Sequence, residues 1–142
     1  MYRVKSGSWG ELKQDAKLIR TLVFINEQNI PEKDEWDDQD VLSQHFIIYD
    51  QEYPVATARI LKNHSIGRVA VLKEYRSKGI GRLIMLKIIE DAQNKNRPFL
   101  HMSSQVHAIS FYKKLGFSVE GDVYDECGIP HVEMRMLLTG ST

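Results

Sequence analysis

The sequence predicts one α/β domain over residues 1–142, built on a mixed, largely antiparallel sheet of six to seven strands flanked by helices. Short segments rich in β-branched and apolar residues alternate with segments whose apolar residues recur at helical spacing. The order along the chain is β-α-β-β-β-α-β-α-β-β, which is typical of an α/β domain. A chain of 142 residues also has the length of one domain with a substantial core.

The amino-terminal half begins with an alternating strand at residues 2–5, followed by a helix over residues 8–26. The apolar face of this helix comprises Leu12, Ala16, Ile19, Leu22, Val23 and Ile25. Residues 45–49 and 55–61 are expected to form two strands, because both are rich in apolar residues and Asp50-Gln51-Glu52 between them indicates a hairpin turn.

The carboxy-terminal half centres on a helix that begins after Gly81 and runs to about Asn96, with Pro98 closing it. A shorter helix over residues 108–115 ends at Gly116, a residue type that favours helix C-termini. Strands are expected at residues 66–71, 99–102, 117–119 and 131–138, with a turn-rich connection over residues 124–130.

The segment over residues 29–40 is strongly acidic and carries one tryptophan, Trp36. Two interpretations remain open. The segment is either a solvated loop whose charges only aid solubility, or the wall of an acceptor site. In the second case its carboxylates would attract a cationic amine and Trp36 would offer the face of its ring.

Residues 68–82 predict a strand, a basic turn with two glycines and the start of a helix. A helix begins with backbone N–H groups that lack intrahelical partners, and its dipole adds positive potential there. Gly79 and Gly81 let a ligand approach the backbone closely, and Arg76, Lys78 and Arg82 add positive charge. The turn therefore predicts a seat for a phosphate or pyrophosphate group.

Two familiar phosphate-binding loops do not fit this turn. A Walker loop places Lys-Ser or Lys-Thr directly after its last glycine, whereas Arg82-Leu83 follows Gly81. The dinucleotide fingerprint requires a third glycine three residues after the second, where this chain has Ile84. What remains is Arg-x-x-Gly-x-Gly between a strand and a helix, a pattern that a phosphate-binding interaction domain could also carry.

The overall charge argues against two classes of partner. Lysine plus arginine and aspartate plus glutamate both total 19, so the formal net charge is zero. Neither nucleic acid nor a membrane surface is expected as a partner, since both require a basic excess. A single cysteine, Cys127, fits a reducing cytoplasm. No histidines, cysteines or carboxylates fall at a metal-ligand spacing, so no metal is expected.

Two motifs carry a family resemblance. The stretch Val69-Ala70-Val71 followed by Arg76-x-x-Gly79-x-Gly81 resembles the acyl-CoA pyrophosphate loop of the GNAT superfamily of N-acetyltransferases. Some thirty residues later, roughly the family's spacing, Phe111-Tyr112-x-x-x-Gly116-Phe117 resembles the second GNAT signature. Residues 23–28, 35–37 and 128–131 are similar to the small bacterial ElaA/YjcF-like branch, so the resemblance spans nearly the whole chain.

The resemblance implies a GNAT-type fold, acetyl-CoA as acyl donor and a set of donor-binding residues. Backbone amides over residues 78–81 would hold the pyrophosphate, and the exposed edge of residues 69–71 would align the pantetheine. Gln105 stands where many relatives have an asparagine that bonds a pantetheine amide. The implied donor-binding set comprises Val69, Ala70, Val71, Arg76, Ser77, Lys78, Gly79, Ile80, Gly81, Arg82 and Gln105.

The resemblance also implies a role for Tyr112. In the family the corresponding tyrosine lies beside the CoA sulfur and can protonate the departing thiolate. A phenol suits this role, because it stays protonated at neutral pH. The alternative is a core tyrosine that packs with Phe111 and Phe117.

An amine must lose a proton before or during attack on a thioester, so a base or a water chain is needed. Glu27 and His131 are the leading candidates, and His45 is a third. Each has a structural alternative, in which Glu27 caps or pairs at a helix end, His45 is a hydrogen-bonded strand residue and His131 only anchors its turn. His64 and His101 are less suited.

The expected activity is direct transfer of an acetyl group from acetyl-CoA to a primary amine of a small molecule or peptide. A non-catalytic acyl-CoA-binding or regulatory module is the rival reading. The sequence leaves open the acceptor, the length of acyl group accepted and the oligomeric state, with a homodimer as one option.

Overall fold

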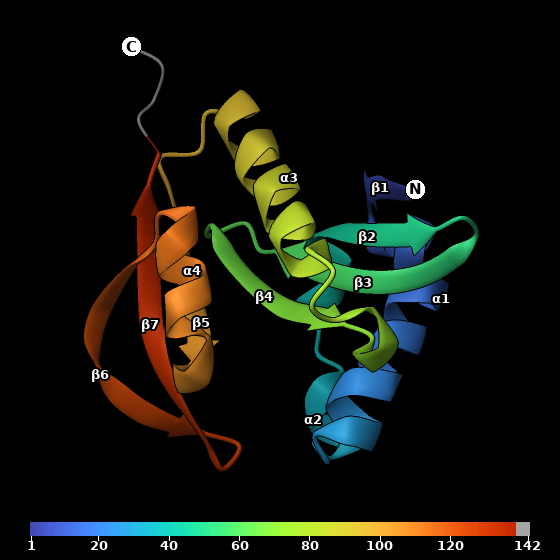
Figure 1. Cartoon of the computed structure of the whole chain (residues 1–142), viewed down its shortest axis with the longest axis horizontal. Coiled ribbons are helices and arrows are strands. Elements are labelled where there is room, and N and C mark those ends of the chain that lie inside the picture. Colours follow the sequence, from blue (N-terminus) through green and yellow to red (C-terminus); the bar gives the residue numbers. More distant parts are fainter. Residues whose placement is uncertain (139–142) are drawn as a thin grey trace.

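A computed structural model describes residues 1–138 and shows a seven-stranded sheet in the order β1-β2-β3-β4-β5-β7-β6 (Figure 1). The strands are β1 Tyr2–Gly7, β2 Gln44–Asp50, β3 Tyr53–Ile60, β4 Ser65–Val71, β5 Phe99–Gln105, β6 Ser118–Glu126 and β7 Ile129–Leu137. Only β4 and β5 pair in parallel, and every other neighbouring pair is antiparallel. The predicted mixed, largely antiparallel sheet is therefore confirmed.

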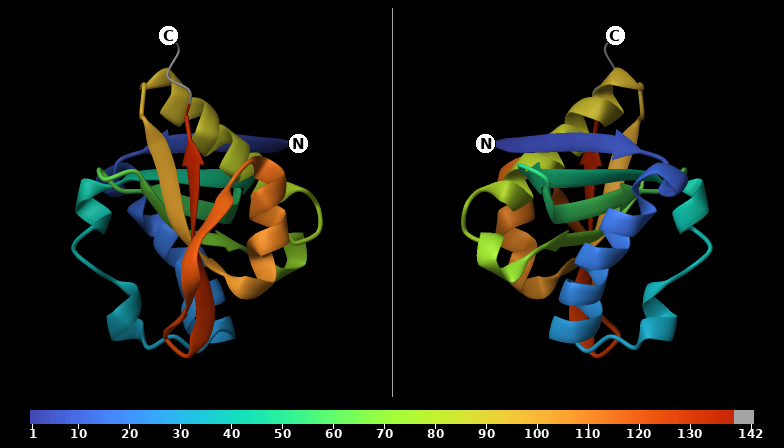
Figure 2. Two further views of the ribbon diagram at one scale, coloured as in Figure 1. Left: turned by 90° about the vertical axis from the view of Figure 1, so that its left-hand side faces the viewer. Right: turned by 90° about the vertical axis from the view of Figure 1, so that its right-hand side faces the viewer.

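Helices cover both faces of the sheet (Figure 2). They are α1 Trp9–Arg20, α2 Glu32–Glu35, α3 Ile80–Asn94 and α4 Ile109–Leu115. Successive side chains of β2 point to opposite faces of the sheet and so belong to different layers. Phe46 and Ile48 pack in one core cluster with α3 and α4, whereas Ile47 and Tyr49 pack in a second cluster with α1.

The first helix begins with a capping box and covers nearly the predicted residues, although its last part is not α-helical. The Ser8 side chain accepts a hydrogen bond from the Glu11 backbone N–H, and the Glu11 carboxylate accepts one from the Ser8 backbone N–H. The α-helix stops at Arg20 and continues as a π-helical segment, Thr21–Glu27. Val23, Phe24 and Glu27 of this π-helical segment line a cleft together with residues of β4.

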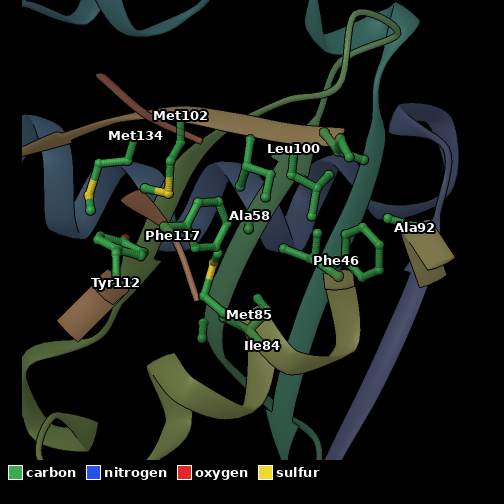
Figure 3. Packing of buried hydrophobic residues seen from close by; sticks show 14 of the residues in the cluster. Phe46, Ala58, Ile84, Met85, Ala92, Leu100, Met102, Tyr112, Phe117 and Met134 are labelled. Carbon is green, nitrogen blue, oxygen red and sulfur yellow. The ribbon is translucent and has the colours of Figure 1, made fainter. Parts of the chain in front are cut away.

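The larger core cluster lies between the sheet and the α3–α4 layer. Figure 3 shows Met85 of α3, Met102 of β5 and Met134 of β7 near Phe117, with Leu100 of β5 further along the same cluster, toward Phe46. Tyr112 of α4 joins the same cluster from its edge, with its ring edge-on to that of Phe117 at 6.1 Å. Packing on the sheet thus fixes the position of the helix that carries the Phe-Tyr motif.

The parallel pair β4–β5 is short. Only Ser65 pairs with His101 and Ile66 with Met102, after which the two strands diverge (Figure 1). On its other side β4 continues to pair with β3 as far as Val71, which faces Ala56. The edge of β4 over residues 67–71 that faces β5 therefore has no strand partner within the described chain.

The β6–β7 hairpin is longer than the sequence predicts. Residues 124–126, expected in a turn-rich connection, belong to β6, and the turn is reduced to Cys127 and Gly128. Both turn residues have positive φ, 52° and 78°, as two-residue hairpin turns of the I′ type require. The expectation was wrong because all of β6 is exposed, so its sequence lacks the apolar alternation that marks a half-buried strand.

Within the described part of the chain, no helix is long and apolar enough to cross a bilayer.

Candidate active site

A cleft of about 860 Å³ opens where β4 and β5 diverge. Its walls come from β4, the carboxy-terminal part of β5, α4, the π-helical segment and the turn between β6 and β7. Nine of the residues predicted from the sequence line it: Glu27, Val69, Ala70, Val71, Arg76, Gly81, Gln105, Tyr112 and His131. The fold therefore brings residues from six separate chain segments to one cavity.

The glycine turn adjoins the cleft at the start of α3. Ser77 and Gly79 both have left-handed backbone conformations, with φ of 65° and 80°. The first intrahelical bond of α3 runs from the Leu83 N–H to the Gly79 carbonyl at 3.0 Å, and no side chain of residues 1–138 caps this end. The backbone N–H groups of residues 80–82 therefore have no intrahelical acceptor, which leaves them available to an anion.

Ser77, Lys78, Gly79, Ile80 and Arg82 do not line the cleft itself. The turn is exposed at residues 77–79 and at Arg82, whereas the side chain of Ile80 is buried in the core, so Ile80 offers only its backbone. The Lys78 ammonium lies 5.6 Å from the centre of the Tyr75 ring.

Gly81 allows close packing around the glycine turn. A Cβ built at this position would lie 3.6 Å from Cζ of Phe111 and 3.9 Å from Cγ2 of Val71. Any residue larger than alanine would push against α4 or the end of β4. The glycine thus brings the start of α3 against the two elements that carry the predicted donor-binding and catalytic residues.

Arg76 is bound by Glu27, although sequence analysis gave the two residues unrelated roles. Its guanidinium donates to the two Glu27 carboxylate oxygens at 2.6 and 2.7 Å, and its Nε donates to the Val71 carbonyl at 3.0 Å. The hydrogen bonds from Arg76 lower the pKa of Glu27. Glu27 thus carries a stable negative charge beside the glycine turn.

Tyr112 is buried in the inner wall of the cleft. Burial raises its pKa to about 12 and is the sole cause of the shift. Within residues 1–138 its hydroxyl makes no hydrogen bond. Its ring packs edge-on against Phe111 and Phe117. The side chain is therefore held by apolar packing, with a protonated hydroxyl not engaged by another protein group.

His131 lies on β7, opposite Gln105 of β5 and Tyr124 of β6 in the sheet register. Its Nδ1 lies 2.7 Å from the Ile129 carbonyl, so this nitrogen carries the proton and donates it. Nε2 is then the basic nitrogen of the neutral ring and lies 3.6 Å from a Glu126 oxygen. The Tyr124 ring stacks on the imidazole at 6.2 Å and its hydroxyl hydrogen-bonds Ser103.

Gln105 lines the cleft at the end of β5. Its side-chain carbonyl lies 2.7 Å from Nε2 of His107, which donates to it. The two amide N–H groups of Gln105 have no protein acceptor among residues 1–138 and can donate to a ligand in the cleft.

His45, the third base candidate, lies outside the cleft. It is buried on β2, where its Nε2 contacts the Asp40 carbonyl at 2.9 Å and its ring packs against Trp9. Burial lowers the pKa of His45. His64 and His101 do not line the cleft either; they contact Arg97 and Glu133, respectively.

The acidic segment is neither a plain solvated loop nor an open acidic wall. Residues 32–35 form α2, and Glu35 and Asp40 are buried at 2% exposure. The Arg20 guanidinium, 1% exposed, donates to Glu35 at 2.7 Å and to Asp40 at 2.7 and 3.2 Å. Trp36 does not line the cleft, and Lys17 Nζ and Arg20 Cζ lie 4.8 and 5.0 Å from the centre of its ring.

Arg59 of β3 extends this buried network. It donates to Asp37 through two bonds of 2.7 and 2.8 Å and to Asp40 at 2.8 Å. The hydrogen bonds from Arg59 lower the pKa of Asp37 to about 2. The acidic segment is thereby fixed to α1 and β3 and forms one side of the cleft, where Asp34, Glu35 and Arg59 are lining residues.

Sequence analysis missed Arg20 and Arg59, although each stands out locally. Arg20 falls on the apolar face that Ala16 and Val23 define, and Arg59 interrupts the apolar run of β3. An arginine at a buried position requires a carboxylate partner, and the only dense acidic stretch is residues 32–40. That combination was the signal for the network.

Within residues 1–138 no three histidine, cysteine or carboxylate side chains are grouped to hold a metal ion.

Comparison with known proteins agrees with this geometry. A family model described as an acetyltransferase (GNAT) domain matches residues 24–138. The uncharacterised N-acetyltransferase YjcF of Bacillus subtilis is 35% identical over 128 residues, covering 87% of this chain and 91% of YjcF. The protein ElaA of Escherichia coli is 34% identical over 125 residues, covering 82% of this chain and 81% of ElaA.

Solved structures show the same fold. The crystal structure of Escherichia coli ElaA matches with a TM-score of 0.87 at 30% identity, covering 96% of this chain and 99% of that chain. An acyl-CoA N-acyltransferase from Pseudomonas aeruginosa also gives a TM-score of 0.87, at 26% identity and with the same coverage. The chain therefore belongs to the GNAT family of acetyltransferases and is an acyl-CoA-dependent N-acetyltransferase.

Proposed function

We propose that the protein transfers an acetyl group directly from acetyl-CoA to a primary amine of a small molecule or peptide. The observation that carries this proposal is the single cleft that joins the unpaired edge of β4, the glycine turn and Tyr112. An elongated thioester could lie along this edge, with its diphosphate at the turn and its acyl group deeper in the cleft.

The glycine turn supplies the diphosphate seat in this proposal. The backbone N–H groups of residues 80–82 lie at a helix start that has no side-chain cap among the described residues, and those of residues 78 and 79 precede them. Lys78 and Arg82 are exposed there and add positive charge. Arg76 is already neutralised by Glu27, so its contribution is to hold the turn through the Val71 carbonyl rather than to add free charge.

The unpaired edge of β4 serves the pantetheine arm and the thioester. An extended ligand can hydrogen-bond to Val69, Ala70 and Val71 as an added strand would. Gln105 on the opposite wall can donate its free amide N–H to the same arm. A backbone N–H of β4 beside the thioester carbonyl would stabilise the negative charge that develops on its oxygen.

Tyr112 is the proposed general acid. As the amine nitrogen forms its bond to the acyl carbon, the bond from that carbon to sulfur breaks and the sulfur needs a proton. The Tyr112 hydroxyl keeps its proton well above neutral pH, because burial raises its pKa to about 12. It can therefore supply that proton to the thiolate.

His131 is the proposed base, acting at Nε2 directly or through water. The Ile129 carbonyl fixes the tautomer that leaves Nε2 basic, and the nearby Glu126 carboxylate would stabilise the imidazolium that forms. Glu27 is a weaker base than a free carboxylate, because Arg76 binds both its oxygens and lowers its pKa. We assign Glu27 instead to holding Arg76.

Two carboxylates that line the cleft and are not bound by arginine favour a cationic acceptor. Glu35, Asp37 and Asp40 are neutralised by arginines, whereas the side chain of Asp34 has no ion-pair partner among residues 1–138. Glu126 is half exposed on the other wall. Both carboxylates line the cleft, which suits an amine that arrives as an ammonium ion.

An amine panel tests the proposed function. Purified protein is incubated with acetyl-CoA and with polyamines, amino sugars, amino acids and peptides, while free thiol is measured and acetylated product is identified by mass spectrometry. We expect thiol release matched one-to-one by an acetylated amine, and its loss in His131→Asn. Tight acetyl-CoA binding without product for every amine class would instead identify a non-catalytic binding module.

A further inference from the structure

The strand that lines the cleft contains a β-bulge at Arg68. Thr57 and Arg59 of β3 face Ala70 and Gly67 of β4, so β4 fits one extra residue into the same span. Arg68 lies in that extra step and has φ of 51°. This left-handed conformation is unfavourable for any residue with a Cβ. Arg68 nevertheless adopts it, although a glycine, Gly67, directly precedes it in the chain.

The side chain of Arg68 explains why an arginine occupies this backbone position. Its Nη2 donates to the Glu35 carbonyl at 2.9 Å and lies 3.4 Å from an Asp37 carboxylate oxygen. Its Nε lies 3.1 Å from a Glu35 carboxylate oxygen. These contacts hold the guanidinium against the acidic segment.

The partners of Arg68 are themselves bound by other arginines. Glu35 accepts a hydrogen bond from Arg20 of α1 and Asp37 accepts one from Arg59 of β3, both at 2.7 Å. Arg20 and Arg59 are buried, at 1% and 5% exposure. The bulge is therefore tied through Arg68 to two other elements, and its position does not depend on the strand alone.

We propose that Arg68 is a positioning residue for acetyl transfer. Its contacts with Glu35 and Asp37 hold the bulge in the left-handed conformation, and the bulge sets the direction of the N–H groups of the following residues, Val69 and Ala70. This inference rests on the proposed function, in which those N–H groups receive the thioester. Arg68 touches neither the donor nor the reacting atoms in this assignment.

Arg68→Gly separates the side chain from the backbone conformation. Glycine adopts φ of 51° without steric strain, so the variant can still form the bulge while it loses the side-chain contacts to Glu35 and Asp37. Gln51→Gly is the matched control, because Gln51 has a similar φ of 56° in an exposed turn remote from the cleft. Arg68→Lys keeps the charge without the forked geometry.

We expect Arg68→Gly to lower kcat by roughly 10- to 100-fold with acetyl-CoA affinity changed by no more than about twofold, since small misplacements of reacting groups are costly. Amide hydrogen exchange over β4 should accelerate in Arg68→Gly and stay unchanged in Gln51→Gly. Arg68→Lys should lie between wild type and Arg68→Gly in both readouts.

Two results would overturn the inference: unchanged β4 exchange in folded Arg68→Gly, or a wild-type kcat in that variant. If Arg68→Gly does not fold, Arg68→Lys with wild-type exchange and kcat overturns it. A wild-type protein that acetylates no amine would contradict the proposed function instead, and the exchange measurement would still decide whether Arg68 holds the bulge.

Discussion

Glu27 and Arg76 lie 49 residues apart in the sequence and meet through two hydrogen bonds of 2.6 and 2.7 Å. The pair joins the end of the π-helical segment to the start of the glycine turn, at the edge of the cleft. It places a carboxylate beside the turn that is proposed to hold a diphosphate. The pair therefore sets the local charge that an anionic donor meets.

Glu27→Gln should tighten acetyl-CoA binding severalfold at low salt. The change frees the Arg76 charge from its partner and removes a negative charge beside the diphosphate seat. The gain should shrink as salt is added, and titration calorimetry at two ionic strengths measures both effects. Glu52→Gln, which removes the same charge from an exposed hairpin turn, is the control. If Glu27→Gln instead left acetyl-CoA affinity unchanged and lowered turnover by about 10²-fold, Glu27 would be the general base.

Tyr112→Phe should slow turnover by about 10²-fold and leave acetyl-CoA affinity nearly intact, because only the proton donor is removed. Since burial raises the pKa of Tyr112 to about 12, the tyrosine should cause no fall in rate up to pH 10. Stopped assays of kcat against pH measure both expectations. Tyr53→Phe, at an exposed site, serves as the control. Wild-type turnover in Tyr112→Phe would remove this residue from the mechanism.

Acid should destabilise the protein through Asp37. Arg59 lowers the pKa of Asp37 from 3.8 to about 2, so the folded state holds this carboxylate charged where the unfolded state protonates it. The stabilisation is fully present above about pH 4 and is lost as pH falls toward 2. Urea unfolding across this window should show a smaller drop in Asp37→Asn than in wild type. Asp38→Asn, at the exposed neighbouring position, is the control. An equal acid-induced fall in the free energy of unfolding in all three proteins would rule out Asp37 as the cause.

Arg20→Met should lower the free energy of unfolding by about 3 kcal/mol, because it removes the buried cation that Glu35 and Asp40 share and leaves each carboxylate with one arginine, Arg68 and Arg59. Denaturant titration followed by circular dichroism measures the change. Lys13→Met removes an exposed cation from the same helix and should have little effect. A loss below about 1 kcal/mol for Arg20→Met would mean that the network contributes no more than a surface ion pair.

Much of the donor-binding side of the site could be predicted from the sequence, because its signals are local. A strand, two glycines and a helix start lie within residues 66–82, and Tyr112 occurs in a compact motif with Gly116. Backbone groups carry most of this side, so short-range conformational preferences suffice to place them. The mixed, largely antiparallel sheet of six to seven strands was likewise predicted from the order of the elements along the chain.

The acceptor side could not be predicted in this way, because long-range pairing sets it. No short-range pattern links Arg59 to Asp37 or Arg76 to Glu27. Taken alone, each of these residues is expected to be a solvated surface charge. The positive φ of Arg68 could not be predicted either, because arginine does not favour a left-handed backbone. The sequence can therefore indicate members of a buried charge network, whereas the pairing between them requires the fold.

The crystal structure of the acetyl-CoA complex tests the central claim most directly. We expect the diphosphate to lie against the backbone N–H groups of the Gly79–Gly81 turn, the pantetheine along residues 69–71 and the sulfur beside the Tyr112 hydroxyl. A diphosphate bound elsewhere on the protein, with the edge of β4 left empty, would contradict the account.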